Sequence, residues 1–357
     1  MLFPYQFVTN HTIYTLQKWM DDLFLTVWCV ADPAVDYNID LLPNDLKAVV
    51  MEIFNDAKIT TDYLYGPIEK VYKIFQAFDQ QTKDSLALSY RHNNSVEDLC
   101  KQTNGCNPFL YSALTVVHED LSVELKKFFK ALFTDVIGLK AVKDRIGYID
   151  SHYDDFVTLN DESKCPFCGI NGIKGRYVSK RDAYDHCLPK GIYPFNSINF
   201  KNLSPMCYDC NSSYKGAKDL LHNNTVRRRA FYPFDATAVP NIQISITFSK
   251  ADISTLTPAD ITLTLTSAGQ QAEVDSWKDV FGIEERYKAK CLEKNDGLYW
   301  FEQATEEFAN VQAELGVGFT KDQWVQHLIK AAKRKPYADG NFIKSKYLEA
   351  CKAVGAL

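Results

Sequence analysis

Apolar residues recur at helical spacing through the first 155 residues of the chain. The clearest stretch runs over residues 123–146, where Leu125, Phe128 and Leu132 fall on one face and lysines on the other. Weaker periodicity of the same kind covers three earlier stretches, residues 14–30, 43–57 and 67–79. This pattern predicts an α-helical region over residues 1–155.

The pattern changes at about residue 156. Glycine, asparagine, proline and cysteine become frequent over residues 156–235, which predicts short strands and turns in place of long helices. A first strand is predicted to end at Asp185 and His186, and a second is predicted over residues 197–203. A helix is predicted to begin near Asp209.

The last region, residues 236–357, mixes the two patterns. Residues 242–248 (IQISITF) and 261–266 (ITLTLT) alternate β-branched with other side chains and predict a strand pair. Helical periodicity returns over residues 273–294 and 321–335. The three regions together predict an α+β protein with a helical N-terminal region, a central module and a mixed C-terminal region.

Composition is ordinary for a globular protein of 357 residues, with 46% hydrophobic and 24% charged residues. The longest apolar run, residues 23–31, is too short to cross a bilayer and fits a buried helix. The first residues lack the basic patch and long apolar core of a signal peptide. We therefore expect a cytoplasmic protein without a membrane partner.

The net charge of −5 conceals a basic centre. Between Lys164 and Arg229 the chain has twelve Lys and Arg against four Asp and Glu. A basic segment in an acidic protein favours a local site for a polyanion, although a solvated charged surface produces the same count.

Four of the ten cysteines form two Cys-x-x-Cys pairs, Cys165 with Cys168 and Cys207 with Cys210. Two such pairs supply four thiolates to one tetrahedral zinc ion, and four thiolates leave no open position for a catalytic water. A redox Cys-x-x-Cys site needs only one pair, so it explains the sequence less well. The spacing therefore predicts a structural zinc site.

The segment that the two cysteine pairs enclose resembles the HNH endonucleases in their zinc-knuckle variety. The matching pattern is CPFC, then DHxxPK, then NLSPMCYDCN, then a lysine, within residues 164–218. The resemblance implies the ββα-metal fold for the central region. It also implies hydrolysis of phosphodiester bonds with a divalent ion.

By this resemblance His186 would be the general base that activates water. Asp185 and Asn211 would be ligands of one Mg²⁺ or Mn²⁺ ion, and Asn202 would brace the loop that orients His186. Lys215 would pair with a phosphate oxygen. The ordinary alternatives are a structural Asp-His pair and a turn-forming Asn202.

HNH modules with such flanks resemble the nuclease subunits of Septu-type anti-phage systems, in which an ATPase partner gates the nuclease. The resemblance implies a DNA substrate and a regulatory or partner-binding role for residues 1–155. One candidate site per chain predicts one cut strand per copy, so cleavage of both strands would need a homo-oligomer or two nicks. Two alternatives are a non-catalytic zinc module that binds nucleic acid or protein, and a standalone restriction-type nuclease.

Overall fold

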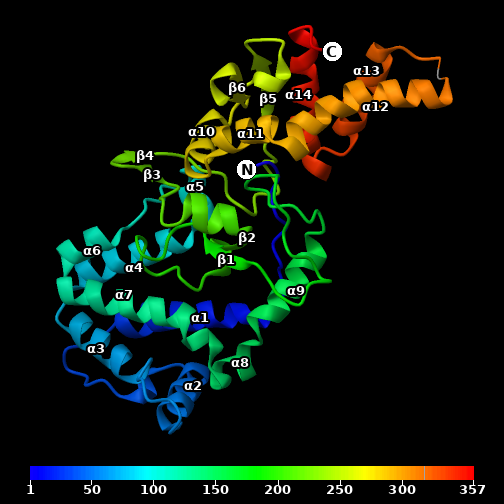
Figure 1. Cartoon of the computed structure of the whole chain (residues 1–357). Helices are drawn as coiled ribbons and strands as arrows, with labels where there is room; N and C mark the ends of the chain where they lie inside the picture. Colours follow the sequence, from blue (N-terminus) through cyan, green and yellow to red (C-terminus); the bar gives the residue numbers. More distant parts are fainter. Residues whose placement is uncertain (317) are drawn as a thin grey trace.

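The computed structural model describes residues 1–316 and 318–357 and has the predicted α+β class. Helices dominate, and the described strands form three two-stranded antiparallel sheets. Figure 1 shows most of the N-terminal helices below or beside strands β1 (Ala183–His186) and β2 (Leu203–Met206), with the C-terminal helices above them. One continuous core of buried apolar side chains crosses both predicted boundaries, near residues 155 and 235. The division into three domains stays a prediction.

Nine α-helices in the described part of the chain precede the first strand. They are α1 (Thr15–Asp22), α2 (Asn44–Asn55), α3 (Tyr65–Gln76), α4 (Gln80–Asn94), α5 (Val96–Lys101), α6 (Tyr111–Val117), α7 (Glu119–Thr134), α8 (Lys140–Ile146) and α9 (Ile149–Leu159). Each of the four predicted helical stretches is confirmed as helical. The stretch 123–146 is wrong as a single helix, because α7 ends at Thr134 and a 3-10 turn precedes α8.

The break after α7 follows from local side-chain chemistry. The Thr134 hydroxyl donates to the Lys130 carbonyl at 3.1 Å, and Asp135 leaves helical geometry with φ −124° and ψ −58°. Short polar side chains that bond to nearby backbone disfavour a continuing helix. Helix α7 therefore ends at Thr134. Its apolar face, which includes Phe129 and Leu132, is buried.

The apolar run at residues 23–31 lies in the core, as predicted. It continues α1 as a π-helical segment, Leu23–Trp28. Phe24 stacks on Tyr90 with centroids 4.3 Å apart, and the Trp28 indole N–H donates to the Ile68 carbonyl at 3.2 Å. This aromatic packing fixes α1 against α3 and α4.

The central module begins with the antiparallel pair β1 (Ala183–His186) and β2 (Leu203–Met206). The first strand ends at His186, as predicted, but a strand over residues 197–203 is wrong. That stretch turns instead, because the Asn199 side chain accepts a hydrogen bond from the Lys201 N–H at 2.9 Å at the start of a 3-10 turn. Asn readily bonds its own backbone and so favours turns.

A helical segment begins at Asp209, as predicted, and runs to Lys215. At its start the Asn211 N–H donates to the Cys207 carbonyl, four residues back. At its end the Gly216 N–H donates to the Asn211 carbonyl, five residues back. The segment is therefore π-helical, a geometry that is frequent at functional sites. A small hairpin of β3 (His222–Asn223) and β4 (Val226–Arg227) follows it.

The C-terminal region contains the predicted strand pair, β5 (Gln243–Phe248) with β6 (Ile261–Thr266). Its helices are α10 (Gln271–Val280), α11 (Ile283–Leu292), α12 (Tyr299–Leu315), α13 (Lys321–Arg334) and α14 (Asn341–Ala353). The predicted helix 273–294 is two helices, because Gly282 takes φ +58° between α10 and α11. No described helix combines the length and apolar character needed to span a membrane.

The N-terminus and the helices α10 and α11 pack on the first cysteine knuckle, residues 165–168. The Leu2 N–H donates to the Pro166 carbonyl at 2.8 Å, and the Tyr287 hydroxyl donates to the Cys168 carbonyl at 2.9 Å. The Trp277 indole N–H donates to the Phe167 carbonyl at 2.7 Å. The knuckle is thus held by residues more than a hundred positions away in either direction.

Candidate functional site

The four paired cysteines lie together and are buried. The sulfur atoms of Cys165, Cys168, Cys207 and Cys210 are all within 4.8 Å of one another, and Cys168 Sγ lies 3.9 Å from Cys207 Sγ. With Zn–S bonds of about 2.3 Å, a tetrahedral zinc site has sulfur–sulfur edges of about 3.8 Å. The cluster could therefore bind a metal ion such as zinc, and the predicted gathering of the two pairs is confirmed.

Two residues outside the motif donate to the cluster's sulfur atoms. The Asn171 side-chain amide lies 3.7 Å from Cys207 Sγ, and Arg286 Nη1 lies 3.2 Å from Cys210 Sγ. Donors to thiolates orient them and offset their charge. Asn171 follows Cys168 closely and could have been found from the sequence. Arg286 is 76 residues from Cys210, and no local pattern predicts it.

A pocket of about 550 Å³ opens between β1, the π-helical segment and α7. Asp185, His186, Asn211 and Lys215 all line it. These are four of the five residues to which the HNH resemblance assigns catalysis or divalent-ion binding. Strand β1 supplies the first two and the π-helical segment the other two, so the module brings together residues from two different elements.

His186 is held in one orientation. Its Nε2 lies 2.8 Å from the Ser197 carbonyl oxygen, and its ring packs edge-on against Phe133 at 4.5 Å. A carbonyl accepts only, so this bond assigns the proton to Nε2 and leaves Nδ1 with its lone pair. Burial is the larger cause and the Lys190 ammonium the next, and together they lower the pKa of His186 to about 3. The imidazole is therefore neutral at pH 7.

Asp185 is buried beside Lys215. Lys215 is only 1% exposed; its Nζ lies 2.9 Å from Asp185 Oδ2 and donates to the His186 carbonyl at 2.8 Å. Burial raises the pKa of Asp185, and the Lys215 ammonium offsets part of this rise. Although the ion pair is close, Oδ2 accepts no aligned hydrogen bond within the described structure. Lys215 is thus paired with the carboxylate.

The oxygen atoms that Asp185 and Asn211 bring to the pocket suit a hard divalent ion. Asp185 Oδ2 is a buried carboxylate oxygen without an aligned donor, and Asn211 brings a side-chain amide to the same pocket. No hydrogen bond of the described residues engages the Asn211 side chain. A carboxylate and an amide oxygen, with open space for water, fit Mg²⁺ or Mn²⁺.

Asn202 lies behind the pocket and does not line it. It is fully buried; its Oδ1 accepts from the Leu188 N–H at 2.7 Å, and its Nδ2 donates to the carbonyls of Leu188 and Asn196 at 3.1 and 3.2 Å. These bonds join the two ends of the loop between β1 and β2, whose Ser197 carbonyl accepts from His186. The predicted bracing of this loop fits the geometry.

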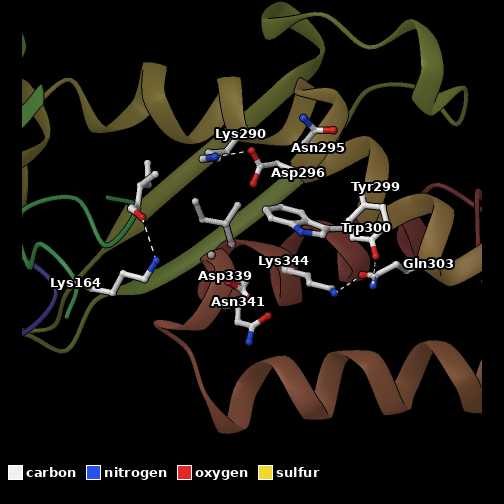
Figure 2. A pocket seen from close by; sticks show the side chains of 13 residues that line it. Lys164, Lys290, Asn295, Asp296, Tyr299, Trp300, Gln303, Asp339, Asn341 and Lys344 are labelled. Carbon is white, nitrogen blue, oxygen red and sulfur yellow. Dashed lines mark hydrogen bonds and ion pairs between the residues drawn. The ribbon is translucent and has the colours of Figure 1, made fainter. Parts of the chain in front are cut away.

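A second pocket, of about 480 Å³, lies in the C-terminal region (Figure 2). It also contains lysines, but they already have partners. Lys290 pairs with Asp296, and Lys344 donates to the Gln303 side chain at 2.5 Å. Lys164 donates to a backbone carbonyl at 3.4 Å. With its ammonium groups engaged and no histidine among its lining residues, this pocket is the weaker candidate for chemistry.

A second buried histidine, His152, contacts strand β1 through Tyr184. His152 lies 3.0 Å from the Tyr14 hydroxyl and 2.5 Å from that of Tyr184, the residue before Asp185. Burial lowers the pKa of His152 to about 3, whereas an unfolded histidine titrates near 6.5. Below about pH 6.5 the unfolded chain therefore binds a proton that the folded chain does not. This difference removes stability as the pH falls towards 3.

We expect His152→Gln to weaken the acid sensitivity of folding. Between pH 7 and pH 5 the free energy of unfolding should fall by up to about 2 kcal/mol less in the variant than in the wild type. Denaturant titrations at the two pH values measure this difference. The contribution of His186 to the pH dependence is the same in the wild type and the variant, so it cancels in the difference. The same pH dependence in both proteins would show that His152 does not titrate as the geometry requires.

Comparison with known proteins gives a short match and no family. No protein-family model matches the chain, and no solved structure matches it. It is similar to the protein Ea31 of Escherichia phage lambda, with 41% identity over 75 residues. The match covers 20% of this chain and 23% of the phage protein, so it spans about a quarter of that relative's length.

Proposed function

We propose that the protein is a metal-dependent HNH-type endonuclease that hydrolyses phosphodiester bonds in DNA. One observation carries this proposal: Asp185, His186 and Asn211 line a single pocket, with His186 fixed by its Nε2 bond to Ser197. The order of these residues between the two cysteine pairs supports the same conclusion. We further propose that the cysteine cluster holds a structural Zn²⁺ and takes no part in the chemistry, because four thiolates leave no position for water.

In this proposal each pocket residue has a separate role in hydrolysis. Asp185 and Asn211 would hold Mg²⁺ or Mn²⁺, which offsets the charge that develops on the phosphate and leaving oxygen. His186 Nδ1 accepts a proton from water as the water oxygen bonds to phosphorus. The bond from phosphorus to the leaving oxygen breaks, and that oxygen is protonated by solvent. The Nε2 bond to Ser197 stabilises the imidazolium that forms.

The proposal is tested by incubating supercoiled plasmid and Mg²⁺ or Mn²⁺ with the purified chain, beside its His186→Ala variant. Loss of supercoiled DNA with the wild type alone would support it. The proposal extends to gating by an ATPase partner and to anti-phage defence, in line with the resemblance to Septu-type nuclease subunits. It also assigns one cut strand to each copy of the chain.

Lys215 is expected to compete with the divalent ion for Asp185. Lys215→Met keeps the length of the side chain and removes the like charge, so Mn²⁺ should bind about tenfold more tightly. Titration calorimetry measures the affinity directly. The melting temperature should also rise more on Mn²⁺ addition than in the wild type, because the variant leaves a buried carboxylate unpaired. Lys201→Met, outside the pocket, is the control, and equal Mn²⁺ affinity in all three proteins would exclude this competition.

A further inference from the structure

Three lysines face the candidate pocket without a carboxylate partner. Lys126 and Lys130 are exposed on α7, and Lys190 is half-buried over the Phe133 ring, 4.9 Å from its centroid. No ion pair of the described residues involves any of the three. With Lys215 they place four ammonium groups around a pocket to which Asp185 contributes a single carboxylate.

Clustered like charges are unfavourable unless an anion binds between them. Burial is the main cause that lowers the pKa of Lys190; the Asp185 carboxylate raises it, and the ammonium groups of Lys130 and Lys215 lower it again. In the C-terminal pocket, by contrast, Lys290 pairs with Asp296 and Lys344 donates a hydrogen bond to the Gln303 side chain (Figure 2). The β1 pocket therefore has the charge that a polyanion requires.

Helix α7 is also fixed relative to the candidate base. Its Phe129 carbonyl accepts a hydrogen bond from the Ser197 hydroxyl at 2.6 Å, and its Phe133 packs against the His186 ring. Lys126 and Lys130 are one helical turn apart, about 6 Å along the axis. The lysines and His186 are thus parts of one rigid wall.

The third lysine of α7, Lys127, differs from Lys126 and Lys130 in both its partner and its position. Lys127 forms an ion pair with Glu124 at 3.4 Å and does not line the pocket. Lys126 and Lys130, on the pocket side of the helix, form no such pair in the described structure. Lys127 thus provides a control in the same helix that is likewise exposed to solvent.

We propose that α7 binds the phosphate backbone of the DNA strand, through Lys126 and Lys130, and leads that strand to His186. The position of the cut at His186 rests on the proposed nuclease function; the backbone contact on α7 does not. The N-terminal helical region would then take part in substrate binding. The family resemblance by itself implies only a regulatory or partner-binding role for this region.

The test measures DNA binding in a His186→Ala background, which keeps the DNA intact. A fluorescein-labelled duplex is titrated with the full chain, with Lys126→Gln/Lys130→Gln and with Lys127→Gln, over a range of salt. The double variant should bind roughly ten- to a hundredfold more weakly at about 0.1 M salt. The slope of log affinity against log salt should become shallower by about 2. Lys127→Gln should behave as the parent does.

Equal affinity and slope in the double variant and Lys127→Gln would overturn the role of α7, as would absence of DNA binding by the parent at low salt. Zinc content and circular dichroism would check that the variants fold. Failure of the nuclease proposal gives a different result. A chain that cleaves no DNA with or without an ATPase partner, yet binds DNA more weakly in the double variant, would keep the α7 surface and lose the catalytic assignment. If the wild type cleaves DNA, and the double variant binds and cleaves DNA as well as its parent does, the catalytic assignment is kept and the role of α7 is lost.

Discussion

Replacement of Cys207 by serine is expected to unfold the centre of the protein and abolish zinc binding. Cys207 is buried in the cysteine cluster, 3.9 Å from the sulfur of Cys168. Structural zinc contributes about 10–16 kcal/mol to the folding of small zinc modules, which matches or exceeds the net stability of a typical domain. Loss of one ligand therefore removes enough free energy to unfold the segment that carries Asp185 and His186.

The measurements are zinc content by mass spectrometry, thermal unfolding by circular dichroism and sensitivity to proteolysis. We expect cleavage first within residues 156–235, and we expect strong chelators to produce the same pattern in the wild type. Cys351→Ser is the matched control, because Cys351 is equally buried in α14 but lies outside the cluster. It should keep its zinc and lose only about 1–3 kcal/mol of stability. A Cys207→Ser protein that keeps both zinc and wild-type stability would contradict the zinc assignment.

The parts of the site that the sequence predicts are those in which chemistry and position are both local. Each Cys-x-x-Cys pair forms within one turn, so its two sulfurs point to one place whatever surrounds them. His186 ends a strand and Asn211 lies near the start of a helix, and both positions follow from short sequence patterns. The errors have local causes as well. At Asn199 and Thr134, side chains bond to neighbouring backbone and interrupt a strand and a helix.

Contacts between distant segments could not be predicted in this way. Arg286 reaches Cys210 only because α11 packs on the π-helical segment, where the Arg286 guanidinium also lies 4.6 Å from the Tyr214 ring centroid. Lys126 and Lys130 belong to a helix whose periodicity predicts only a solvated face. Their position at the pocket depends on the packing of α7 against the loop that contains Ser197. A helical pattern in the sequence shows which face of a helix is polar. It does not show which other part of the protein lies next to that face.

His186→Ala is expected to lower the rate of plasmid cleavage by about 10²–10⁴-fold, the usual contribution of a positioned general base. Because His186 is buried against Phe133 and bonds to Ser197, alanine also leaves a small cavity and an unpaired carbonyl. His186→Gln separates the two effects, since its amide can still donate to Ser197 but has no basic nitrogen. It should be as inactive as His186→Ala and closer to the wild type in stability.

The control for this experiment is His222→Ala, which alters a histidine of β3 that does not line the pocket. It should cleave at the wild-type rate, and all the variants should keep their zinc. DNA binding should survive in both His186 variants, because the lysines of α7 remain. Equal cleavage by the wild type and His186→Ala would remove the base from the mechanism. DNA binding without cleavage in every protein, with or without an ATPase partner, would favour a zinc-stabilised binding module, in which the convergence of Asp185, His186 and Asn211 has no catalytic purpose.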